Sequence, residues 1–91
     1  MFPPARCEKV TTWLTGLFES LARAGLPLGP NVKLDELENC YEVRAALLSP
    51  IPGSGWKFLR NYILEYSQEC GWKVKELKRT NYFLSFKASA T

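Results

Sequence analysis

Hydrophobic residues recur at helical spacing in two stretches of the chain. Residues 7–24 and 54–70 carry large apolar side chains at intervals of three and four positions, which places them on one side of a helix. Both stretches are therefore predicted to be amphipathic helices. Gly25 and Gly71 follow as expected C-terminal stops, and Ser54 is the expected N-cap of the second helix. The apolar positions are Val10, Trp13, Leu14, Leu17, Phe18 and Leu21, then Trp56, Leu59, Tyr62, Ile63, Tyr66 and Cys70.

After Gly71 the hydrophobic and polar residues alternate, which is typical of a β-strand with one buried face. Residues 72–78 and 82–88 are predicted to pair as a β-hairpin. Its inner face, toward the helices, is expected to carry Trp72, Val74, Glu76, Leu84 and Phe86. Its outer face is expected to carry Lys73, Lys75, Leu77, Phe83, Ser85 and Lys87.

Residues 32–48 fit two different structures. With a helical period they form an apolar stripe of Leu34, Leu37, Tyr41, Ala45 and Leu48. With a period of two, residues 40–48 form a half-buried strand that follows a short acidic turn or helix at 34–38. The preceding residues 26–31 contain two prolines and a glycine, so a turn-rich connector is expected there.

The preferred fold is a single α+β domain spanning residues 1–91. It is a two-layer sandwich in the order helix–strand–helix–strand–strand, with both helices on one face of a three-stranded sheet. Strands 40–48 and 72–78 are expected to run parallel, because a helix connects them. The alternative is a winged helix, in which 33–48 is a third helix and 72–87 is the wing. The break at 49–55 is long for a helix-turn-helix, which counts against that alternative.

Composition and charge indicate a folded domain and suggest which class of partner it could bind. The chain is 46% hydrophobic and 13% aromatic, which indicates a folded domain. Its formal net charge of +3 is unevenly placed: residues 1–45 hold five basic and six acidic residues, and residues 46–91 hold seven basic and three acidic residues. Such an asymmetry can mark a surface for nucleic acid or for an acidic partner.

Several kinds of chemistry are not supported by the residues present. The chain has no histidine, which excludes Ser–His and Cys–His nucleophiles. Cys7, Cys40 and Cys70 are widely spaced and give no zinc pattern or disulfide framework. Residues 53–55 lack the lysine of a phosphate-binding loop. We therefore expect no catalytic site, cofactor, metal or small-molecule substrate, and we predict that the protein is not an enzyme.

The predicted function is that of a small binding or regulatory module. Nucleic acid is the first partner considered, because a basic hairpin with an exposed aromatic residue supplies cations for phosphate and a ring for stacking. The predicted contacts are Lys73, Lys75, Lys78, Arg79, Phe83 and Lys87. In the winged-helix alternative, Lys57, Arg60 and Asn61 would enter the groove instead.

The rival prediction is a protein-binding inhibitor, adaptor or accessory subunit. It would use aromatic residues that are expected to be exposed, because a core of this size cannot bury all of them: Trp56, Tyr62, Tyr66, Tyr82 and Phe83. No stretch approaches the length of apolar residues that spans a bilayer, and no secretion signal is visible. We therefore expect a cytoplasmic protein with reduced thiols and no membrane partner.

Overall fold

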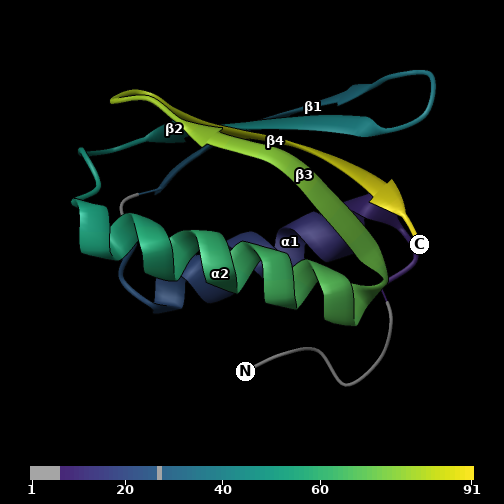
Figure 1. The fold of residues 1–91 in the computed structure, drawn as a ribbon, viewed down its shortest axis with the longest axis horizontal. Helices are drawn as coiled ribbons and strands as arrows, with labels where there is room; N and C mark the ends of the chain where they lie inside the picture. The colour runs from purple at the N-terminus through teal and green to yellow at the C-terminus, as the bar shows by residue number, and fades with distance from the viewer. Residues whose placement is uncertain (1–6, 27) are drawn as a thin grey trace.

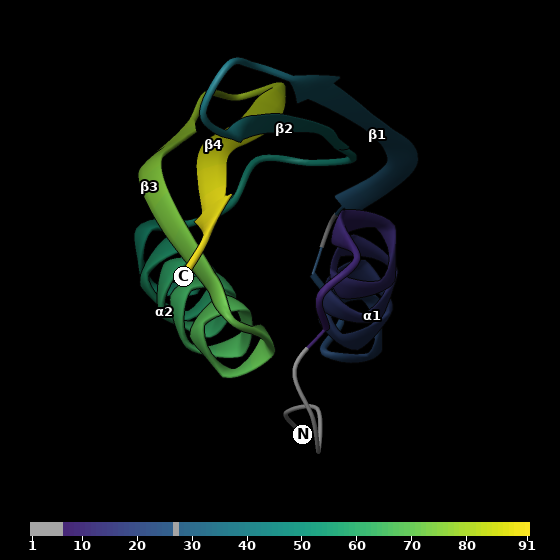
Figure 2. The ribbon, with the colours of Figure 1, turned by 90° about the vertical axis from the view of Figure 1, so that its right-hand side faces the viewer.

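The computed structural model of the protein describes residues 7–26 and 28–91, in which a helix and a hairpin alternate twice. The elements are α1 (Val10–Arg23), β1 (Leu28–Glu36), β2 (Tyr41–Leu47), α2 (Gly53–Cys70), β3 (Trp72–Arg79) and β4 (Phe83–Ala90). The strands form one sheet in the order β1-β2-β4-β3, and all neighbouring strands are antiparallel. Both helices lie on the same side of this sheet (Figures 1 and 2). The predicted two-layer α+β class is confirmed, with four strands instead of three.

The extra strand is β1, and it lies in a region that the sequence pattern did not assign to the sheet. The prediction of a connector at 26–31 and of an acidic turn or helix at 34–38 is wrong over 28–36, because these residues pair with β2. An edge strand tolerates proline and glycine, since one of its sides needs no ladder hydrogen bonds. The pairing is irregular between Leu28 and Val32 and regular from Val32 to Glu36.

The strand interpretation of residues 40–48 is correct, with bounds Tyr41–Leu47. The helical interpretation of 33–48 is therefore wrong, and with it the winged-helix alternative. β2 and β3 run in the same direction, as expected, because each is antiparallel to β4, which lies between them. The segment β2–α2–β3 is thus a split β-α-β unit.

The helix ends follow the expected glycines more closely than the expected cap. Gly25 and Gly71 both have the left-handed backbone conformation, with φ of 77° and 91°. At the start of α2 the N-cap is Pro52, so Ser54 lies inside the helix, and its predicted capping role is wrong. In the part of the chain that the structure describes, neither helix is both long enough and apolar enough to span a membrane.

Aromatic residues from three elements form the centre of the core. Trp13 of α1 stacks on Trp72 of β3, with ring centroids 4.7 Å apart and planes 8° apart. Phe86 of β4 meets Trp13 edge-on at 6.1 Å. The indole Nε1 of Trp13 donates a hydrogen bond to the buried Ser67 Oγ at 3.0 Å, which ties α1 to α2. The helices therefore cover one sheet face tightly and leave the other face to solvent.

Candidate functional site

The face of the sheet that points away from the two helices is not covered by them (Figure 2). Residues directly opposite each other in antiparallel strands share a face, and successive residues of a strand alternate between faces. Val43 and Ala45 of β2 and Leu84 and Phe86 of β4 are at most 1% exposed, so they mark the inner face. The residues between them point outward. We call this exposed side of the sheet the outer face.

The outer face carries the excess positive charge of the described residues. It holds six basic and three acidic residues, whereas the solvent side of the helical layer holds four of each. The outer-face charges are Lys33, Arg44, Lys73, Lys75, Lys78 and Lys87 against Asp35, Glu42 and Glu76. Those of the helical layer are Lys9, Arg23, Lys57 and Arg60 against Glu8, Glu19, Glu65 and Glu69.

Strand register sorts these charges into rows that cross the sheet. Lys33 lies opposite Arg44, Arg44 opposite Ser85, and Ser85 opposite Lys78. These four positions form one line over all four strands, about 14 Å long at the usual strand spacing. We call its three cations, Lys33, Arg44 and Lys78, the basic row. No acidic residue lies opposite any of them in the register.

The neighbouring row has balanced charge. Lys75 lies opposite Lys87, Lys87 opposite Glu42, and Glu42 opposite Asp35. An open hollow of about 190 Å³ lies between this row and the basic row, with both carboxylate and ammonium groups on its lining. The two rows differ in what they offer an anion, since only the basic row presents cations without carboxylates.

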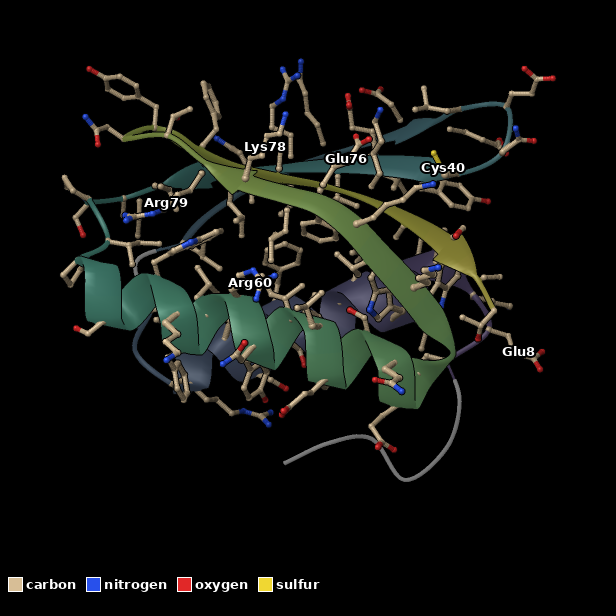
Figure 3. The ribbon with its side chains drawn as sticks, in the orientation of Figure 1. Glu8, Cys40, Arg60, Glu76, Lys78 and Arg79 are labelled. Carbon is tan, nitrogen blue, oxygen red and sulfur yellow. The ribbon has the colours of Figure 1, made fainter. Side chains whose placement is uncertain are left out.

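A β-bulge in β3 brings Glu76 to the outer face. The register shifts between Lys75 and Lys78, and Glu76 has a left-handed φ of 54°. The extra residue reverses the alternation, so Glu76 is exposed and Leu77 packs against the core. The predicted faces of these two residues are therefore wrong, because a bulge leaves no mark in the alternating pattern. Figure 3 shows Glu76 and Lys78 on the side of the sheet away from the helices.

Glu76 forms an ion pair with Lys87, with Lys87 Nζ 3.0 Å from the carboxylate. The hydrogen bond and the charge of Lys87 lower the pKa of Glu76, and the same contact raises the pKa of Lys87. Both side chains are open to solvent, so the pair contributes little to stability. An incoming anion would have to compete with Glu76 for Lys87.

An exposed aromatic ring lies beside the basic row. Phe83 is 47% exposed and lies opposite Ala46 on the outer face. The Arg44 guanidinium carbon is 6.0 Å from its ring centroid. The Thr80 hydroxyl accepts hydrogen bonds from the backbone N–H groups of Tyr82 and Phe83, at 3.1 and 3.0 Å, and so fixes the turn before the ring. A cation and a stacking surface are thus held side by side.

Five of the six residues predicted to contact a partner lie on the outer face, and the sixth, Arg79, does not. Lys73, Lys75, Lys78, Phe83 and Lys87 all lie on the outer face. Arg79 lies on the inner face, where its guanidinium carbon is 5.3 Å from the Trp56 ring centroid and where it donates a hydrogen bond to the Ile51 carbonyl (Figure 3). Arg79 therefore secures the segment ahead of α2 and is not available to the surface formed by the others.

The residues proposed for a groove-binding helix lie elsewhere. Lys57, Arg60 and Asn61 are exposed on α2, in the helical layer and not on the outer face. Two outer-face cations, Lys33 and Arg44, were absent from the predicted contacts. Arg44 could have been found, because the strand pattern of residues 40–48 already points it outward. Lys33 could not, because β1 has no clear strand pattern.

Among the described residues, no three His, Cys, Asp or Glu side chains are grouped so that they could hold a metal ion. Comparison of the chain with protein-family models, with curated proteins and with solved structures finds no match. The outer face is therefore the feature of the molecule that bears on its function.

Proposed function

We propose that the protein binds single-stranded nucleic acid on its outer face and has no enzymatic activity. The observation that carries this proposal is the basic row beside Phe83: three cations on a line without acids, and an exposed ring next to the central one. Phosphates contact Lys33, Arg44 and Lys78, and a base stacks on Phe83. Lys73, Lys75 and Lys87 extend the positive surface along β3 and β4.

A single strand suits this surface better than a duplex. The face of a base is accessible only when the base is unpaired or splayed out, and stacking on an aromatic residue needs that face. An open sheet with cations spread across its strands supports an extended backbone without sequence preference. The proposal includes a cytoplasmic location, because single-stranded RNA is abundant there.

The mixed charge of the surface limits the strength of binding. Asp35, Glu42 and Glu76 lie on the same face and repel phosphate, so the basic row supplies the main contacts. Three phosphate contacts to a single strand give a slope of about −2 in a plot of log affinity against log salt concentration. Affinity should then fall about 20-fold between 50 and 200 mM salt.

The test is fluorescence anisotropy with short labelled single strands of DNA and RNA over this range of salt. The triple variant Lys33→Ala, Arg44→Ala, Lys78→Ala should lose most of the affinity and nearly all of the salt slope, because each lost contact removes about 0.7 from it. The matched control Lys9→Ala, Lys57→Ala, Arg60→Ala removes the same charge from the helical layer and should bind within about twofold of the natural protein. Equal losses in the two triple variants would contradict the proposal.

A protein partner is the second candidate, and the structure's aromatic residues bear on it. Tyr66 is only 5% exposed and Trp56 packs beneath Arg79, so neither offers an open surface. Phe58 of α2, at 53% exposure, has its ring centroid 6.1 Å from that of Tyr62 and adds an aromatic pair on the helical layer. If neither single strand binds at low salt, this candidate replaces the first.

A further inference from the structure

Two cysteines far apart in the sequence meet at one end of the helical layer. Cys7 precedes α1 and Cys70 ends α2, and they are 63 positions apart. Their Sγ atoms lie 2.7 Å apart, with the Cys70 thiol toward the Cys7 sulfur. A disulfide bond is about 2.05 Å long, so the two sulfurs are already closer to bonding distance than two thiols in ordinary contact would be.

The backbone around this pair is fixed by contacts that do not involve the sulfurs. The Cys7 backbone N–H donates to the Cys70 carbonyl at 3.0 Å. The Trp72 indole Nε1 donates to the Cys7 carbonyl at 2.7 Å. Trp72 is itself 4% exposed and stacked on Trp13 in the core. The two thiols are thus held together by the fold, and closing a bond between them needs only small side-chain rotations.

We propose that Cys7 and Cys70 form a reversible dithiol/disulfide pair that fastens the segment ahead of α1 to the end of α2. The oxidant is a small-molecule disulfide such as oxidised glutathione. Cys7 is half-buried and is the accessible sulfur, whereas Cys70 is 1% exposed. The Cys7 thiolate attacks the oxidant and releases one thiol, which takes up a proton.

Cys70 completes the exchange from the protected side. Its thiol loses its proton, its sulfur attacks the Cys7 sulfur of the mixed disulfide, and the second small thiol leaves with that proton. Two thiols of the protein are oxidised and one small disulfide is reduced to two thiols, so atoms and electrons balance. Burial and the hydrogen bond to Cys7 together raise the pKa of Cys70 to about 12, so closure should be faster at alkaline pH.

The bond would stabilise the fold and leave the outer face unchanged. It closes a loop that contains α1, both strands of the first hairpin and α2, and a long closed loop restricts the unfolded chain strongly. Both cysteines lie in the helical layer, whereas Lys33, Arg44 and Lys78 lie on the sheet face that points away from that layer. The oxidised protein should therefore melt roughly 10 to 20 °C higher than the reduced protein. Its affinity for single strands should be unaltered.

The experiment oxidises the purified natural chain with oxidised glutathione, then blocks the remaining thiols with iodoacetamide and maps the peptides by mass spectrometry without reduction. We expect a monomer lighter by two hydrogen atoms, a linked peptide containing Cys7 and Cys70, and alkylation at Cys40 alone. Dithiothreitol should restore three alkylated cysteines and the lower melting temperature. Cys40 lies in the turn between β1 and β2 and serves as the internal control.

Two cysteine variants test whether the bond joins Cys7 to Cys70. Cys40→Ser should still form the bond, and Cys7→Ser, at the more exposed member of the pair, should not. Alkylation of both Cys7 and Cys70 after oxidation, or a linked peptide that contains Cys40, would overturn the proposal. So would a bond that leaves the melting temperature unchanged, because the fastening of the two segments would then have no effect on the fold. None of these outcomes depends on nucleic-acid binding.

Discussion

The two faces of the sheet are made by alternate residues of the same strands, and Phe83 and Phe86 of β4 show how differently they are used. Phe86 is 1% exposed and lies against Trp13 in the core. Phe83, three residues earlier, is 47% exposed and lies beside Arg44. An identical side chain therefore contributes to stability on one face and is available for contact on the other. Residue type alone does not distinguish these roles; the position in the pleat does.

The inner face is specified by packing from both layers. Trp13, Trp72 and Phe86 form a mutual aromatic cluster, and Tyr41 meets Trp72 edge-on with centroids 5.8 Å apart. On the outer face, among the residues whose side chains the structure describes, Lys87 is held by Glu76 and Phe83 lies beside Arg44. Changes on the inner face should therefore act on folding, and changes on the outer face on binding.

The largest expected effect is the loss of stability when a phenylalanine of the inner face is replaced, compared with the same replacement on the outer face. Phe86→Ala should lower the free energy of unfolding by about 3 to 5 kcal/mol, since it removes a buried ring. Phe83→Ala should lower it by less than about 1 kcal/mol, because exposed positions contribute little. Urea denaturation followed by tryptophan fluorescence measures both changes, and Trp13 and Trp72 report directly on the core.

The binding assay should give the opposite order. A lost base stack costs about 1 to 3 kcal/mol of affinity, so Phe83→Ala should weaken binding to single strands roughly 5-fold to more than 100-fold. Phe86→Ala, measured at a temperature where it remains folded, should bind nearly as the natural protein does. If Phe83→Ala costs stability but not affinity, the division of labour between the two faces is wrong.

Sequence patterning was sufficient for the elements whose own residues carry a long periodic signal. The helices show several turns of apolar spacing, and the hairpin of β3 and β4 shows alternation on both strands. In the first hairpin, only one strand has such a signal. β2 has an alternating run and was predictable, whereas β1 has charges, a glycine and a proline and was not. β1 is a strand because it pairs with β2. This tertiary contact cannot be predicted from the local propensity of the β1 residues.

The composition of the outer face was predictable to the same extent as the strands that form it. Lys73, Lys75, Phe83 and Lys87 follow from the alternation of the second hairpin. The bulge adds one residue to β3, so residues 76–79 change face relative to the regular pattern. Glu76 and Lys78 come to the outer face, and Leu77 and Arg79 come to the inner face. Lys33 enters the surface only when β1 is known. The basic row is therefore a property of the register and not of any contiguous stretch of sequence.

A smaller effect contrasts a buried ionisable group with exposed ones. Burial and the hydrogen bond to Cys7 raise the pKa of the Cys70 thiol to about 12 from 9.0. The native state therefore keeps a proton that the unfolded chain loses, and stability falls as pH rises above about 9. The steepest contribution from one such group is about 1.4 kcal/mol per pH unit.

Urea denaturation of the reduced protein at several alkaline pH values measures this decline. Burial also raises the pKa of Tyr66, which packs nearby, so the natural protein must be compared with a variant that retains this tyrosine. Cys70→Ala is that control, and its stability should fall less steeply with pH. Parallel curves for the two proteins would show that the environment of Cys70 is not as dry as its 1% exposure indicates.

The smallest expected effect concerns the ion pair that restrains Lys87 on the outer face. Glu76→Gln retains the shape of the side chain and its backbone position but removes the negative charge that holds Lys87. Affinity for single strands should rise roughly twofold, since one cation is released and one repulsive charge is lost. The salt slope should become slightly steeper, because Lys87 can then replace a counterion on phosphate. Glu69→Gln removes the same charge from the exposed side of α2 and is the matched control; an equal rise in that variant would assign the effect to net charge and not to the outer face.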